Sequence, residues 1–172
     1  NTGRLAAKAV VGSEVRLWGE RGITMDTGHW AVDGGDAIVL FPTEDSITLD
    51  ERTVGQLRRP LTLIVLDGSW RQATKMARRV PGLSSLPHVK VPITGPSGYH
   101  LRRPPQPHCL GTLEAVARVL GQLEGPEVEA KLQHLFDEMV LRTLKTRSPD
   151  SVRARLLENL EHRAAPELCR DP

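Results

Sequence analysis

The chain has 172 residues, of which 39% are hydrophobic and 26% charged, and its formal net charge at neutral pH is +2. This length suffices for one domain with its own core, and this composition excludes an intrinsically disordered chain. The sequence has no apolar run as long as a membrane-spanning helix requires. The net charge is too small to indicate nucleic-acid binding, so only the distribution of the charges could do so.

The two cysteines exclude two kinds of structure. Cys109 and Cys169 are 60 positions apart and form no C-x-x-C pair. We therefore expect neither a zinc site nor a disulfide framework. The expected location is the cytoplasm, where cysteines stay reduced. The histidines also lack the spacing of metal ligands, and we expect no metal. Because the first residue is Asn1 rather than Met, a preceding segment stays an open question.

Strands and helices alternate along the first part of the chain. Short apolar runs bounded by Pro or Gly indicate buried strands at 37–41 and 61–66. Ala-rich or polar periodic segments predict helices at 3–11 and 49–58. Residues 14–18 fit a strand or a loop.

The second part begins with a helix that Ser69 can cap, over about 70–80. Its expected inner stripe consists of Trp70, Ala73, Ala77 and Val80. The opposite face is basic and consists of Arg71, Lys75, Arg78 and Arg79. The run 88–93 predicts a third strand, placed near a sheet edge by Pro92. Further helices are expected from Thr112 and from Pro126 to about 147. A charged amphipathic segment is expected over 151–163, either peripheral or mediating self-association. This order predicts a single α/β domain with a mostly parallel sheet flanked by helices.

The segment LTLIVLDGSW, at 61–70, is the most informative one. It places an acid, Asp67, and an aromatic residue, Trp70, after a strand that we expect to be buried, where open α/β sheets gather ligands. An alternative is a helix start capped by Asp67 or Ser69 and packed by a core Trp. Both interpretations stay open from spacing alone.

Three more short signals lie at predicted element ends: FPTE at 41–44, YHLRRPP at 99–105 and GTLEA at 111–115. Each has a plain explanation, as a turn, a tethered loop or a helix start. Together with DGSW they offer a carboxylate, a fixed cation in Arg102, a helix N-terminus, and aromatic faces in Trp70 and Tyr99. This combination suits a nucleotide-like ligand.

The ordered set of motifs resembles the DTW-domain family, the tRNA-uridine aminocarboxypropyltransferases. Asp67-Gly68-Ser69-Trp70 matches the family's Asp-x-Thr-Trp motif, with Ser in place of Thr. Tyr99, Arg102 and Pro105 match a Tyr-x-x-Arg-x-x-Pro pattern, and 111–115 matches Ser-Thr-hydrophobic-Glu-Ala with Gly for Ser. Asn1-Thr2-Gly3-Arg4-Leu5 and Leu40-Phe41-Pro42 are also similar. The Cys-rich segment that usually precedes them in the family does not occur in this sequence.

The resemblance implies a catalytic domain over 1–147, followed by a C-terminal helical extension at 148–172. It implies a SPOUT-related fold and leaves open a knot in the C-terminal half. It also implies S-adenosylmethionine as donor and a tRNA uridine as acceptor, whose N3 would receive the 3-amino-3-carboxypropyl group. 5′-Methylthioadenosine would be released. Two rival interpretations are an RNA methyltransferase with the same donor and a non-catalytic RNA-binding domain.

The expected site residues fall into three groups. Asp67 is the catalytic candidate, as a base for uridine N3–H or as an electrostatic anchor for the donor. The cofactor-binding candidates are Phe41, Pro42, Thr43, Leu66, Gly68, Ser69, Tyr99, Arg102, Leu110, Gly111, Thr112 and Glu114. The RNA-binding candidates are Arg58, Arg59, Trp70, Arg71, Lys75, Arg78, Arg79 and Arg103. Arg102 suits a donor carboxylate or a phosphate.

Overall fold

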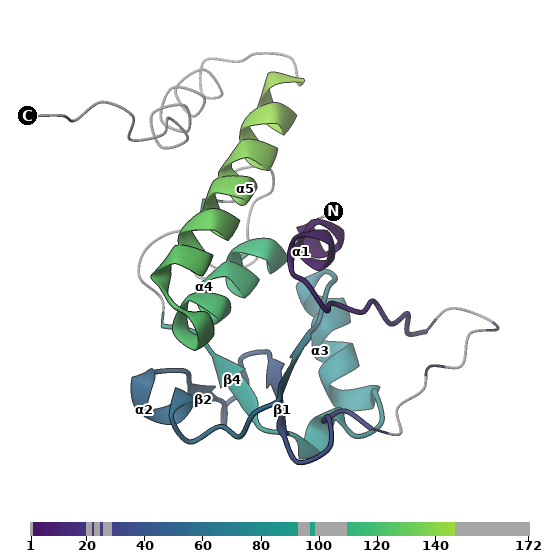
Figure 1. Cartoon of the computed structure of the whole chain (residues 1–172). Coiled ribbons are helices and arrows are strands. Elements are labelled where there is room, and N and C mark those ends of the chain that lie inside the picture. Colours follow the sequence, from purple (N-terminus) through teal and green to yellow (C-terminus); the bar gives the residue numbers. More distant parts are fainter. Residues whose placement is uncertain are drawn as a thin grey trace, which may run out of the picture.

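The computed structural model describes residues 2–19, 22, 25, 29–92, 97–98 and 110–146. Within them, five α-helices, one 3-10 helix and four strands alternate along the chain (Figure 1). In chain order these are α1 (Thr2–Ala9), β1 (Asp36–Leu40), β2 (Ile47–Thr48), α2 (Glu51–Val54), β3 (Leu61–Val65), α3 (Trp70–Arg79), η1 (Leu83–Ser85), β4 (His88–Lys90), α4 (Thr112–Glu124) and α5 (Pro126–Lys145).

The strands form one parallel sheet in the order β2-β4-β1-β3, which confirms the α/β prediction. Of the two strands expected to be buried, the one at 37–41 is confirmed and the one at 61–66 is not. β3 lies at the sheet edge with every residue partly exposed, whereas Ala37 to Leu40 of β1 are buried. Both runs are strongly apolar, so the strand order rather than the sequence distinguishes an edge strand from a central one.

The prediction for β4 was also wrong in its position and length. β4 ends at Lys90 and lies between β1 and β2 rather than at an edge. Pro92 follows the paired residues, so its missing N–H removes no ladder bond. The outer neighbour, β2, is only two residues long and was not predicted, because such a strand has no measurable periodicity.

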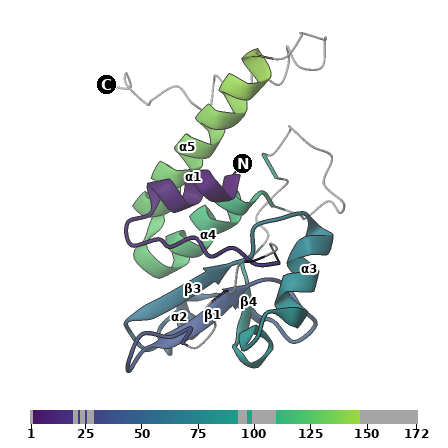
Figure 2. The same ribbon diagram turned by 90° about the vertical axis from the view of Figure 1, so that its right-hand side faces the viewer.

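Two apolar layers enclose β1. Ile38 and Leu40 pack with Val119 and Leu123 of α4, whereas Val39 packs with the α3 side, where Ala73, Ala77 and Val80 are buried. This is the alternation expected of successive strand residues. Helices α4 and α3 therefore cover opposite faces of the sheet, and Figure 2 shows α1 and α5 on the same side as α4. A third cluster joins α1, α4 and α5, with Phe136 and Val140 fully buried.

Helix ends agree with several local predictions. Ser69 caps α3: its Oγ accepts from the Gln72 N–H at 3.4 Å, and Gln72 Oε1 accepts from the Ser69 N–H at 2.8 Å. Gly125, with φ of 110°, ends α4 immediately before Pro126 opens α5. Residues 14–18, which fitted a strand or a loop, belong to neither a helix nor a strand. None of the described helices has the length and apolar character needed to cross a bilayer.

Candidate functional site

The carboxyl ends of β1 and β3 lie side by side and define the candidate site. Leu40 is opposite Val65 in the parallel register, so Phe41 and Leu66 leave the sheet next to each other. Leu66 leads directly into Asp67. The structure therefore brings the FPTE and DGSW segments together at the carboxyl end of the sheet, as we expected for segments that follow two parallel strands.

Asp67 is exposed, and its Oδ1 accepts a hydrogen bond from the Thr112 hydroxyl at 2.8 Å. Thr112 is the first residue of α4, 45 positions further along the chain. Because Ser69 caps α3, Asp67 is not needed for that role. The exposed carboxylate therefore joins the end of β3 to the start of α4.

Helix α1 also reaches this carboxylate, through a glycine. A Cβ atom at Gly3 would collide with the carboxyl carbon and both oxygens of Asp67. Only a residue without a side chain lets the first turn of α1 come so close. In the sequence, Gly3 is part of the stretch Asn1-Thr2-Gly3-Arg4-Leu5, and its closeness to Asp67 was not predicted. A glycine in a short Ala-rich helix is itself a signal, because it costs helix stability.

Trp70 is placed differently from the expected core stripe of α3. Its side chain is 41% exposed, and its ring lies 5.2 Å from that of Phe41, centroid to centroid, at an angle of 34°. Phe41 is buried. At the carboxyl end of the sheet, Trp70 thus presents an aromatic surface that its helix does not cover.

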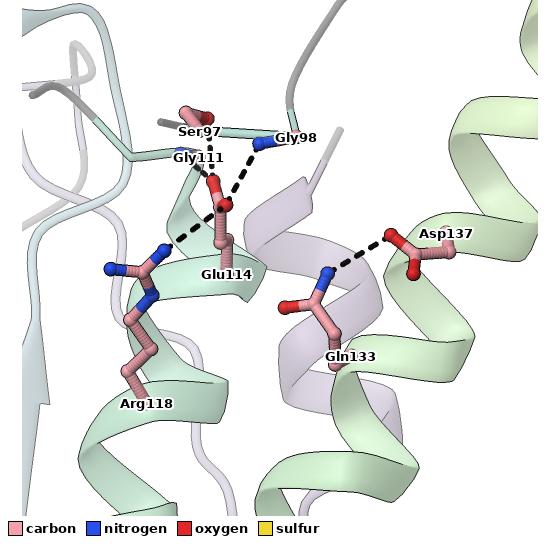
Figure 3. A network of polar contacts seen from close by, with 7 residues as sticks. All are labelled: Ser97, Gly98, Gly111, Glu114, Arg118, Gln133 and Asp137. Atoms are coloured by element: carbon pink, nitrogen blue, oxygen red, sulfur yellow. Dashed lines mark hydrogen bonds and ion pairs between the residues drawn. The ribbon is translucent and has the colours of Figure 1, made fainter. Parts of the chain in front are cut away.

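Glu114 is buried and joins two segments of the chain, at 97–98 and at Gly111 (Figure 3). Its carboxylate accepts from the Gly98 N–H at 3.0 Å, the Gly111 N–H at 3.3 Å and the Ser97 hydroxyl at 2.6 Å. Arg118 lies 3.7 Å away, one helical turn later. The prediction that Glu114 is a helix-start residue explains only its hydrogen bond with the Gly111 N–H. Its ion pair with Arg118 was not predicted, although the two residues are four positions apart in a predicted helix.

These contacts change what Glu114 can do. Its carboxylate already accepts hydrogen bonds inside the chain, so its visible role is to fix the backbone of Gly111 and Gly98. Gly111 is buried and Leu110 is partly buried. Pro42, Thr43, Gly68 and Ser69 are exposed at the neighbouring strand ends. The described cofactor-binding candidates therefore lie around the carboxyl end of the sheet.

The RNA-binding candidates divide into two groups. Arg71, Lys75, Arg78 and Arg79 are exposed on α3, which starts at the site, and Lys75 lies 5.9 Å from the centre of the Trp18 ring. Arg58 and Arg59 precede β3, at the opposite end of the strands, and pair with Asp36 at 2.8 Å and Glu124 at 2.6 Å. A five-residue strand is about 16 Å long, so the structure does not bring these two arginines to Asp67.

Some expectations lie outside the described residues, namely Tyr99, Arg102, Arg103, His100, His108, both cysteines and the segment 148–172. His88 is among the described residues, and its Nδ1 lies 3.1 Å from the Leu86 carbonyl oxygen. Among the described residues, no group of three or more His, Cys, Asp or Glu side chains is arranged to hold a metal ion.

Comparisons with known proteins agree with the motifs. Residues 1–144 match the model of the DTW domain. The chain is 37% identical over 102 residues to tRNA-uridine aminocarboxypropyltransferase 2 of Drosophila melanogaster, covering 59% of this chain and 40% of that protein. It is 31% identical over 157 residues to tRNA-uridine aminocarboxypropyltransferase A of Arabidopsis thaliana, covering 76% of this chain and 60% of that protein. The chain thus spans about half the length of these relatives.

Proposed function

Because the chain belongs to the DTW-domain family, we propose that it transfers the 3-amino-3-carboxypropyl group of S-adenosylmethionine to N3 of a tRNA uridine. The observation that carries the proposal is the exposed carboxylate of Asp67, held by the Thr112 hydroxyl where β3, α1 and α4 meet. The names of the relatives, which are tRNA-uridine aminocarboxypropyltransferases, support transfer of an aminocarboxypropyl group to a tRNA uridine. The donor and the N3 position rest on the family resemblance.

The reaction is a displacement at the methionine γ-carbon. The bond from uridine N3 to this carbon forms while the bond from the carbon to sulfur breaks, and 5′-methylthioadenosine leaves. The N3 proton is lost. The sulfonium is already a good leaving group, so the enzyme mainly has to align the two reactants. Asp67 either accepts the proton or balances the positive charge of the donor.

The donor site would be built from the segments that follow β1 and β3 and precede α4. Backbone groups of 41–43, 66–69 and 110–112 would surround the adenosine, with Glu114 fixing Gly111 beside them. Arg102 would bind the donor carboxylate through its two-pronged guanidinium, and Tyr99 would cover a ring. These two assignments rest on the family motif alone.

The tRNA would approach along α3. Trp70 offers an exposed ring next to Asp67 on which an unstacked base could lie. Arg71 and Lys75 follow on the exposed side of the same helix and would bind phosphates. A flipped base in a loop of the tRNA could reach Asp67 from this side at low unstacking cost.

The proposal includes a catalytic domain over 1–147 with a SPOUT-related fold and a C-terminal helical extension at 148–172. The parallel sheet with its site at the carboxyl ends of β1 and β3 is compatible with that relationship. A crystal structure with donor bound, traced through 93–109, would test both the relationship and the knot.

The decisive experiment incubates the chain with tRNA and S-adenosylmethionine and searches for 3-(3-amino-3-carboxypropyl)uridine by mass spectrometry. We expect this nucleoside, together with 5′-methylthioadenosine, and its loss in Asp67→Ala. S-adenosylhomocysteine as the by-product would indicate methyl transfer instead. RNA binding without any binding of S-adenosylmethionine would indicate a non-catalytic domain.

A further inference from the structure

Three elements meet at the Asp67 carboxylate, and this arrangement bears on which role the residue has. Asp67 follows β3, Gly3 belongs to the first turn of α1, and Thr112 is the first residue of α4. Helices α1 and α4 pack against each other over the sheet (Figure 2). The position of the carboxylate is therefore determined by the packing of two helices as well as by its own strand.

On one side, the carboxylate of Asp67 lies directly against the backbone of Gly3. A methyl group at this position would overlap the carboxyl carbon and both oxygens, so Asp67 would have to move. Gly3 therefore acts as a positioning residue: its missing side chain is the space that the carboxylate occupies. Among other glycines, Gly55 offers a contrast, because its added Cβ would meet only the carbonyl oxygens of Glu51 and Arg52, at ordinary distances of 3.5 and 3.6 Å.

Thr112 holds the carboxylate on the other side. Its hydroxyl donates to Oδ1 at 2.8 Å, a hydrogen bond that is strongest when the acceptor is charged. The first turns of α1 and α4, which carry Gly3 and Thr112, both direct the positive ends of their helix dipoles toward this region. The Thr112 hydrogen bond and the close approach of Gly3 together hold the Asp67 carboxylate in a fixed place.

We propose that Asp67 is a fixed counter-charge for the positively charged donor, positioned by Gly3 and Thr112, and not the base that accepts the N3 proton. A base has to give up its charge during the reaction, which would weaken the Thr112 hydrogen bond and the interaction with both helix ends. A counter-charge keeps these interactions throughout. The N3 proton would then pass to water while the N3–C bond forms and the C–S bond breaks. This inference rests on the proposed function.

Calorimetry with three probes tests the proposal on the full chain. S-adenosylmethionine carries a sulfonium and an ammonium group, S-adenosylhomocysteine only the ammonium, and 5′-methylthioadenosine neither. Asp67→Asn keeps the shape and the oxygen acceptor but removes the charge. We expect it to weaken S-adenosylmethionine binding by at least about tenfold and to leave 5′-methylthioadenosine binding within about twofold. Equal losses for the first two probes would assign the ammonium as the partner, and a loss for the first alone would assign the sulfonium.

The positioning residues have matched variants. Thr112→Val and Gly3→Ala should weaken the binding of S-adenosylmethionine and leave that of 5′-methylthioadenosine nearly unchanged, as Asp67→Asn does. Thr112→Ser keeps the hydroxyl and should bind S-adenosylmethionine normally. Gly55→Ala should bind all three probes as the native chain does. Thermal melting of each variant separates a misplaced carboxylate from an unfolded chain. A general loss of stability would weaken all probes equally, which would overturn the positioning role.

Two results would overturn the counter-charge. One is Asp67→Asn binding S-adenosylmethionine normally while transfer to tRNA is lost, because that is the behaviour of a base. The other is a native chain that binds no S-adenosylmethionine. A native chain that binds the donor with the expected charge selectivity but makes no modified uridine would instead contradict only the proposed transfer.

Discussion

The indole ring of Trp70 lies against the phenyl ring of Phe41, with centroids 5.2 Å apart and planes tilted by 34°. Phe41 is buried beside the α3 layer, whereas Trp70 is 41% exposed. The buried ring thus fixes the exposed one at the end of the sheet where Asp67 lies. An aromatic residue held in this way loses little conformational freedom when a base stacks on it.

We therefore predict that Trp70→Ala weakens tRNA binding by about 1–3 kcal/mol, the range for base–aromatic stacking. Trp70→Phe should retain most of the affinity because it keeps a π-face. The affinity for S-adenosylmethionine should stay the same in both variants, and tRNA binding can be followed by fluorescence anisotropy. Unchanged tRNA affinity in Trp70→Ala would show that this ring contributes only packing.

Glu114 should be far more important for stability than its position in a helix start suggests. Truncation to Ala would leave Arg118, whose side chain is 13% exposed, without its carboxylate and would free two backbone N–H groups. Breaking a buried pair in this way typically costs about 3–5 kcal/mol. We expect Glu114→Ala to reduce the free energy of unfolding by an amount of this order, measured in urea.

The chain offers a matched control for that variant. Glu138 and Arg142 form another i,i+4 pair, at 3.2 Å, but the arginine side chain is 81% exposed. Glu138→Ala should cost no more than about 0.5 kcal/mol. Similar losses for Glu114→Ala and Glu138→Ala would mean that the buried cluster contributes no more than a surface pair.

Charge reversal should separate the two groups of RNA-binding candidates. Arg71→Glu and Lys75→Glu alter the exposed side of α3 close to Trp70, so we expect weaker tRNA binding and a smaller dependence of affinity on salt. Arg58→Glu changes a residue already paired with Asp36 at the other end of the strands. It should affect stability more than tRNA affinity. The reverse ranking in salt titrations would place the RNA on the opposite end of the sheet.

The sequence predicted most of the elements because their signals are local. Apolar runs bounded by Pro or Gly located β1 and β3, and Ser69 with the periodic residues after it located α3. The strand order could not be predicted, since it depends on contacts between distant segments. This is why β3 was expected to be buried and β4 to lie near an edge, and why the two-residue β2 was missed.

For the site, too, only the features with local signals could be predicted from the sequence. The motif at 67–70 was visible because it follows a strand, and a site at the end of that strand needed only the rule for parallel sheets. The partners of Asp67 were not visible as such: Gly3 and Thr112 are 64 and 45 positions away in the sequence. The second tether of Glu114, at Gly98, likewise depends on a folded contact across 16 positions.

The amino end of the sheet should respond to acid through Asp36. The backbone N–H of Arg58 and then its guanidinium hold the pKa of Asp36 below its ordinary value of 3.8. A lowered pKa in the folded chain means that the contribution of Asp36 to stability is fully present well above pH 3.8 and is lost as the pH falls through the folded pKa. Asp36→Asn should therefore be less stable than the native chain at neutral pH, and the two urea unfolding curves should converge in acid. Asp45→Asn, in an exposed turn, serves as the control for the removal of one negative charge. A difference between Asp36→Asn and the native chain that persists below the folded pKa would mean that packing, rather than charge, explains the effect.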